Sequence, residues 1–160
     1  MTSFNDVVKW RRMFHQYPEL SKYEYKTTQR IKDILTSYNI KMIDIPMETG
    51  LVAEIGQGEK CIAVRTDIDA LPIQEQVSQD FTSTNDEVMH ACGHDIHMAS
   101  ILAIATKLKE EEEQLNGRVR FLFQPAEELG YGAKAMAKTN ALDDVQAIVA
   151  VSYTHLRAHE

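Results

Sequence analysis

A strand-like run, a long helical run and a second strand-like run follow one another in the second half of the 160-residue chain. The two apolar runs, Cys61–Thr66 and Val119–Phe123, are typical of buried strands. Between them, residues with helical spacing begin near His94 and continue to about Gln114. A helix of this length can connect two parallel strands by a right-handed crossover. The succession therefore predicts an α/β protein with a mixed sheet flanked by helices.

Two helices are expected before the first strand. Ser3 followed by Asp6 is a capping-box variant that begins a helix, which ends near Tyr17 because Pro18 follows. A second run with helical periodicity covers Tyr25–Tyr38. Apart from the turn between them, the N-terminal segment is thus expected to be helical.

Further strands should extend the sheet. The additional elements expected are the strands Ile40–Ile45 and Leu51–Ile55, a helix at about Ala133–Lys138 and the strand Val145–Val151. The glycine-containing turn at residues 56–59 predicts a hairpin between the runs on its two sides. Residues 69–88 contain a proline and show no clear period, so we expect a loop there.

The sequence MHACGHDIH, at Met89–His97, concentrates side chains that can bind a divalent metal or carry a proton. These side chains are His90, Cys92, His94, Asp95 and His97. Gly93 permits a sharp turn into the helix. Because a helix N-terminus offers free N–H groups and the positive end of the dipole, we expect the pKa of the Cys92 thiol to be lowered. A helix start with incidental histidines is the alternative, but the density of mixed ligands predicts a metal site.

Other polar residues follow the two strands at the same edge of the expected sheet. Asp67 and Asp69 come after the first strand, and Glu127 and Glu128 come after the second. Ligands of open α/β sheets gather at the carboxyl ends of the strands, so these residues and the cluster should converge. Adjacent carboxylates at a strand end should point in different directions, so that one can bind a cation while the other accepts a proton from water. A surface acidic pair, and aspartates that only cap turns, are the alternatives.

Composition narrows the classes of function. With 17 basic and 24 acidic residues, a net charge of -7 and no basic stripe, nucleic acid and anionic membranes are poor partners. No apolar stretch approaches the length of a membrane span, and the polar start lacks the core of a secretion signal, so we expect a cytoplasmic protein. Cys61 and Cys92 are expected to be one buried apolar residue and one ligand rather than a disulfide.

Four motifs resemble those of the N-acyl-amino-acid amidohydrolases, which include hippurate hydrolase and the auxin-conjugate hydrolases. This family belongs to the aminoacylase and carboxypeptidase G superfamily of dinuclear metallohydrolases. The motifs are RRMFHQYPELS at Arg11–Ser21, RTDIDALPI at Arg65–Ile73, MHACGHDIH at Met89–His97 and FQPAEE at Phe123–Glu128. They occur in the expected order and cover about residues 4–151. The resemblance implies a partial catalytic α/β domain at residues 1–151, the N-terminal part of a longer enzyme.

The resemblance also implies a chemistry. Two divalent ions, Zn, Co, Ni or Mn, would serve hydrolysis of an N-acyl amino acid to a carboxylic acid and an amino acid. Cys92, His94 and Glu128 would be metal ligands, and Glu127 would be the general base and acid. Asp67 would support a ligand, whereas the resemblance assigns no role to His90, Asp95 and His97. A lid domain beyond this chain often mediates dimerisation in the family.

The last nine residues, 152–160, do not follow the family pattern. Relatives place a histidine where this chain has Ser152. His155 could replace it, but three further residues shift a side chain by roughly 10 Å in an extended chain and reverse its facing. We therefore expect an atypical tail and an inactive fragment. A non-catalytic metal-binding remnant and a cysteine-nucleophile amidase built on Cys92 remain as alternatives.

Overall fold

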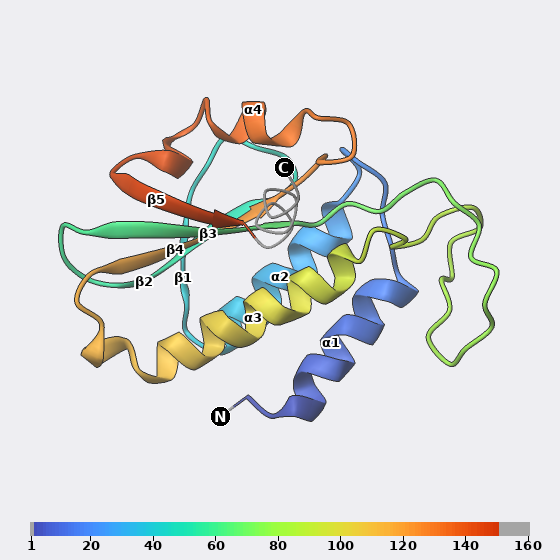
Figure 1. Ribbon diagram of the computed structural model, residues 1–160, viewed down its shortest axis with the longest axis horizontal. Helices are drawn as coiled ribbons and strands as arrows, with labels where there is room; N and C mark the ends of the chain where they lie inside the picture. The colour runs from blue at the N-terminus through green and yellow to red at the C-terminus, as the bar shows by residue number, and fades with distance from the viewer. Residues whose placement is uncertain (1, 151–160) are drawn as a thin grey trace, which may run out of the picture.

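The computed structural model describes residues 2–150, which form a five-stranded mixed sheet with helices on both faces (Figure 1). In space the strands follow the order β1-β2-β4-β3-β5. In chain order the elements are α1 (Phe4–Gln16), α2 (Tyr25–Ser37), β1 (Lys41–Ile43), β2 (Leu51–Gly56), β3 (Cys61–Asp67), α3 (His94–Glu110), the 3-10 turn Glu112–Gln114, β4 (Arg118–Gln124), α4 (Gly132–Met136), the 3-10 turn Asn140–Leu142 and β5 (Val145–Ala150). The predicted α/β class is confirmed.

Helices α1, α2 and α3 cover one face of the sheet, and the short helix α4 lies on the other (Figure 1). The larger hydrophobic core lies between the sheet and the first three helices, with α3 in contact with both α1 and the strands. A smaller cluster, which includes Val52, Leu122 and Met136, forms the core under α4. Because burial of apolar side chains is the main source of stability, the larger core fixes the position of α3.

Local signals in the N-terminal sequence act as predicted. The hydroxyl oxygen of Ser3 accepts a hydrogen bond from the backbone N–H of Asp6, whose carboxylate accepts one from the backbone N–H of Ser3. This reciprocal capping box begins α1 by satisfying two N–H groups that have no partner within the helix. The turn that begins α3 is also confirmed, since Gly93 has φ +86, a conformation that favours glycine.

The predicted crossover from β3 through α3 to β4 is present. The two strands are parallel, and Asp67 at the end of β3 is paired with Gln124 at the end of β4. Helix α3 ends at Glu110 rather than at Gln114, because the charged run after it tightens into a separate 3-10 turn. The carboxyl ends of both strands therefore open at the same edge of the sheet, next to the start of α3.

The predicted hairpin between β2 and β3 is wrong, because β4 lies between these two strands. Val119 of β4 is paired with Ile55 on one side and with Ile62 on the other. The turn at residues 57–60 reverses the direction of the chain but does not require β2 and β3 to be neighbours. It can span two strand spacings of roughly 4.8 Å each. β4 is buried along nearly its whole length, and a central position covers such a strand best.

The remaining segments differ from expectation only in length. β1 has three residues, fewer than the predicted Ile40–Ile45, and α4 begins at Gly132 and ends at Met136. Residues 68–93 form the expected long loop, whose two ends are joined by a bridge between Leu71 and Met89. Within residues 2–150, no helix combines the length and the apolar character needed to cross a membrane.

Candidate metal centre

The structure brings together three of the predicted ligands from two separate segments of the chain. Cys92 lies in the loop before α3, His94 begins α3, and Glu128 follows β4. One sulfur, one nitrogen and one oxygen atom of these side chains all lie within 4.8 Å of one another. The expected convergence at the carboxyl edge of the sheet is thus observed.

A second group of potential ligands shares the same histidine. Asp67, His94 and His97 also offer one ligand atom each within 4.8 Å of one another. The rings of His94 and His97 have centroids 5.8 Å apart, as expected for neighbours on one helix face. His94 therefore lies between two adjacent sets of ligand atoms, one facing Cys92 and the other facing Asp67.

The imidazole of His94 is oriented by Asp69. Its Nδ1 lies 2.9 Å from the backbone carbonyl oxygen of Asp69, which can only accept a hydrogen bond. Donation from Nδ1 leaves Nε2 for a metal, and Nε2 faces the carboxylates of Asp67, Glu127 and Glu128 at 3.8, 4.0 and 3.9 Å. Burial lowers the pKa of His94, but the hydrogen bond to Asp69 and the charge of Asp67 outweigh it and raise the pKa to about 9.

Asp69 joins three parts of the structure. Its Oδ2 accepts hydrogen bonds from the Ser21 hydroxyl at 2.6 Å and from the backbone N–H of Glu128 at 3.0 Å. Burial acts to raise the pKa of Asp69, but hydrogen bonds from His94, Ser21 and Glu128 hold it below its usual value. Asp69 is therefore a fixed carboxylate that positions two potential ligands.

Asp67 lies near Nε2 of His94, on the other side of the ring from Asp69. Its side chain is buried and forms an ion pair with Arg65. Burial raises the pKa of Asp67 to about 6, although the charges of Arg65 and His94 oppose this effect. A cation bound between Asp67 and His94 would offset the unfavourable burial of the Asp67 carboxylate.

The predicted divergence of Glu127 and Glu128 is wrong. β4 ends at Gln124, so the alternation of side chains along a strand does not reach them, and both approach the same nitrogen of His94. They differ in environment instead. The side chain of Glu127 is 38% exposed and that of Glu128 is 21% exposed. Only Glu128 belongs to the group with Cys92.

The expected lowering of the pKa of Cys92 is wrong for the chain without metal. Desolvation of the thiol, followed by the negative charge of Glu128 and its hydrogen bond, raises the pKa to about 11. Cys92 lies outside α3, one residue before the N-cap residue Gly93. The helix dipole therefore acts on its thiol only weakly, and the nearby carboxylates outweigh the dipole. A cation among these carboxylates would reverse the effect and favour the thiolate. The sulfur, nitrogen and oxygen donors therefore fit a divalent transition metal.

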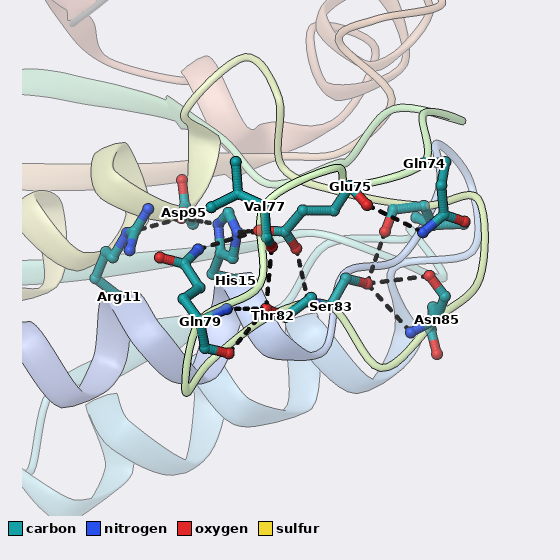
Figure 2. A network of polar contacts seen from close by, with 11 residues as sticks. Arg11, His15, Gln74, Glu75, Val77, Gln79, Thr82, Ser83, Asn85 and Asp95 are labelled. Atoms are coloured by element: carbon teal, nitrogen blue, oxygen red, sulfur yellow. Dashed lines mark hydrogen bonds and ion pairs between the residues drawn. The ribbon is translucent and has the colours of Figure 1, made fainter.

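Asp95 belongs to a different network, which faces α1 (Figure 2). Its Oδ2 lies 3.0 Å from Nε of Arg11 and 2.8 Å from Nδ1 of His15. The other ring nitrogen of His15 lies 3.0 Å from the carboxylate of Glu75, which also accepts a hydrogen bond from the backbone N–H of Ser83. This network ties α1, the long loop and the start of α3 together, and Asp95 belongs to neither of the two groups of potential ligands among residues 2–150.

No metal-ligand or catalytic pattern in the sequence marks His15 and Glu75 as functional residues. The only signal was that His15 lies within the motif at Arg11–Ser21 and Glu75 follows the motif at Arg65–Ile73. His90 is buried at 4% exposure, and burial lowers its pKa to about 4. Neither ring nitrogen of His90 has a hydrogen-bond partner among residues 2–150. Ser152 and His155 lie outside the described residues.

A mixed α/β sheet that gathers sulfur, nitrogen and oxygen donors at the carboxyl ends of its parallel strands is typical of a metallohydrolase. Residues 63–157 match Peptidase family M20/M25/M40. The chain belongs to this family. The resemblance inferred from the four motifs is thereby confirmed at the level of the family.

Relatives with solved structures and with assigned activities support the same relationship. The chain is 46% identical over 145 residues to an N-acetylcysteine deacetylase of Bacillus subtilis, a match that covers 89% of this chain and 38% of that protein. It is similar to the Bacillus subtilis protein YXEP, described as a dinuclear metal binding peptidase from the M20 family, with a TM-score of 0.89, 45% identity and coverage of 91% of this chain and 42% of that one. A putative aminohydrolase from methicillin-resistant Staphylococcus aureus gives a TM-score of 0.87 at 36% identity, with coverage of 91% and 40%. The chain thus spans about 38% of the length of the first of these relatives.

Proposed function

We propose that this chain supplies the metal-binding part of a hydrolase that cleaves the amide bond of N-acyl amino acids. The observation that carries the proposal is the group formed by Cys92, His94 and Glu128, with Glu127 beside it. The relatives named N-acetylcysteine deacetylase support an N-acyl amino acid as substrate. The products would be a carboxylic acid and a free amino acid.

The ligands follow from the two groups around His94. Cys92, His94 and Glu128 would hold one divalent ion, and Asp67 and His97 face a neighbouring position. A relative described as dinuclear supports two ions, for which mixed donors suit Zn, Co, Ni or Mn. When bound, such ions polarise a carbonyl and lower the pKa of a bound water.

Glu127 is best suited to move the proton. Its carboxylate is more exposed than that of Glu128 and is absent from the group that contains Cys92. It can therefore accept a proton from water at the site and donate one to the leaving amine. The raised pKa of Cys92 argues against the alternative in which this thiol is the nucleophile, because the thiolate is the reactive form.

Metal content and amidase activity, measured together, test the proposal. The purified chain is dialysed against each metal and analysed for bound ions, and the complete enzyme is assayed on a panel of N-acyl amino acids that includes N-acetylcysteine. Metal-dependent release of the amino acid supports the proposal. Turnover that resists a chelator but is lost on thiol alkylation would instead support a cysteine nucleophile. Bound metal without turnover would support a non-catalytic binding module. The absence of both bound metal and turnover would support an inactive remnant.

A further inference from the structure

We propose that Glu24 is a positioning residue for the metal centre, acting through a hydrogen bond to the backbone N–H of Ala126. Glu24 would thereby hold the turn that presents Glu127 and Glu128, without touching metal or substrate. The inference rests on the proposed metal site.

Glu24 occupies an environment in which a carboxylate is rarely found. The residue is 0% exposed and lies at the start of α2, far from the ligands in sequence. Its Oε1 accepts a hydrogen bond of 2.7 Å from the N–H of Ala126, 102 residues further along the chain. Because desolvation of a carboxylate is unfavourable, such a group is retained only where its hydrogen bonds matter.

Helix capping does not account for Glu24. The residue occupies the N-cap position of α2, where a polar side chain usually accepts a hydrogen bond from the first turn. Here the Glu24 side chain makes no capping hydrogen bond. Its acceptor is directed instead at the loop after β4, so its contribution is to that loop.

Ala126 needs an external partner because its conformation is strained. Its φ of +49 lies in the left-handed region, which residues other than glycine rarely adopt. The carbonyl of Ala126 accepts hydrogen bonds from the N–H groups of Tyr131 and Gly132 at 3.2 and 3.1 Å. The peptide units on both sides of Ala126 are therefore fixed, the preceding one by Glu24 and the following one by the turn that leads into α4.

The direction of the Ala126 backbone decides where the glutamates project. Only Pro125 and Ala126 separate the end of β4 from Glu127. A rotation at Ala126 would carry both carboxylates away from His94. The segment between α1 and α2, which ends at Glu24, also supports the glutamate turn through Ser21. The hydroxyl of Ser21 donates a hydrogen bond to the Asp69 carboxylate, which also accepts one from the backbone N–H of Glu128. A segment with no ligand thus supports the site at two positions.

A matched pair of variants tests the inference. Glu24→Gln keeps an acceptor oxygen, whereas Glu24→Met has similar length but no acceptor. Binding of Co²⁺ to the purified chain is measured by the visible absorption of the bound ion, which reports its ligand geometry. Glu24→Met should weaken Co²⁺ binding by about 10–100-fold, the usual effect of losing a group that orients a ligand, and should alter the spectrum. Glu24→Gln should retain most of the affinity and the parent spectrum.

Two controls separate positioning from general loss of stability. Ile31→Ala removes a fully buried side chain from α2, so it should lower the unfolding temperature while leaving Co²⁺ affinity and spectrum unchanged. In a Glu128→Gln background, Glu24→Met should cause little further loss, because the turn then has no metal-binding carboxylate at 128 to position.

Hydrogen exchange of the parent chain provides an independent check. Ala126 lies outside every helix and strand, yet its amide should be protected from exchange.

The outcomes are distinguishable. If the parent chain binds no Co²⁺, the proposed function fails and this inference fails with it. If the parent binds Co²⁺ and Glu24→Met binds it equally well, this inference alone is overturned. Equal losses in Glu24→Met and Ile31→Ala, or rapid exchange of the Ala126 amide, would also overturn it.

Discussion

The Nδ1 atom of His94 lies 2.9 Å from the backbone carbonyl oxygen of Asp69. A backbone carbonyl can only accept a hydrogen bond, so this contact keeps the proton of the neutral imidazole on Nδ1. Nε2 is directed at the carboxylates of Asp67, Glu127 and Glu128. The main chain thus orients the imidazole within the candidate metal centre.

Replacement of either ligand from the MHACGHDIH motif should reduce metal binding. Cys92→Ala and His94→Ala each remove one donor from the group of three, so each should lower the metal bound per chain after dialysis. Cys61→Ala is the matched control, because that cysteine is buried in β3. Parent-level metal in both ligand variants would place the site elsewhere.

The adjacent glutamates should separate by function. In the complete enzyme, Glu127→Gln should leave metal content nearly unchanged and lower turnover by roughly 10²–10⁴-fold, the usual loss for a general base. Glu128→Gln should reduce metal content first. The two variants make the same chemical change at neighbouring positions, so each is the control for the other. Equal loss of metal in both would contradict this division.

Loss of the His15 imidazole should be costly for stability. His15→Ala would leave the buried carboxylates of Asp95 and Glu75 without the group between them. A hydrogen bond to a buried charged group typically contributes about 1.5–3 kcal/mol to the free energy of unfolding, and the variant loses two while Asp95 keeps Arg11 as a partner. Urea unfolding measures the change. Lys107→Ala, which breaks a pair with a 63% exposed lysine, should cost no more than about 1 kcal/mol. Similar losses in the two variants would refute the network's importance.

Glu24→Gln should change the pH dependence of stability. Burial raises the pKa of Glu24 above its usual 4.5, while hydrogen bonds from its own backbone, from Ala126 and from Thr49 oppose it. A raised pKa gives stability that is present below 4.5 and is lost as pH rises. Glutamine does not titrate, so the variant should gain stability relative to the parent as pH rises above 4.5. Urea unfolding with a chelator present measures this difference, and a constant difference would contradict the prediction.

Gly132→Ala should disturb the glutamate turn. A Cβ atom at Gly132 would lie 1.5 Å from the carbonyl oxygen of Pro125, so the turn must move. We expect weaker metal binding and lower stability. Gly130→Ala is the control, because its Cβ would meet nothing within 4 Å and its φ of +61 should cost only about 1–2 kcal/mol. Metal affinity that falls equally in both variants would show that strain, not displacement, is responsible.

Much of the site could be predicted because its determinants are local or follow from one topological rule. The β3-α3-β4 unit is visible in the period of its apolar residues, and it forces Asp67 and Glu128 to the same edge. Gly93 marks the turn that places Cys92 beside His94.

Other features depend on contacts that no local pattern encodes. The turn after β2 indicated a reversal, but only the burial of β4 decides that a third strand enters the gap. His15 and Glu75 are ordinary polar residues until the loop returns across α1. The raised pKa of Cys92 has a related cause, because it comes from desolvation in the folded chain and from the charges of Glu128 and Glu127, which lie 36 and 35 residues further along the chain.

The placement of β4 between β2 and β3 has a consequence for how the molecule assembles. During synthesis β2 and β3 emerge early, but each lacks its central neighbour until residues 118–124 have left the ribosome. Long-range pairing of this kind slows folding, since the entropy cost of closing a large loop comes before any favourable contact between its ends. Until then the unpaired strands are open to association with other chains. The interval between translation of β3 and arrival of β4 is therefore when these strands leave an edge unpaired.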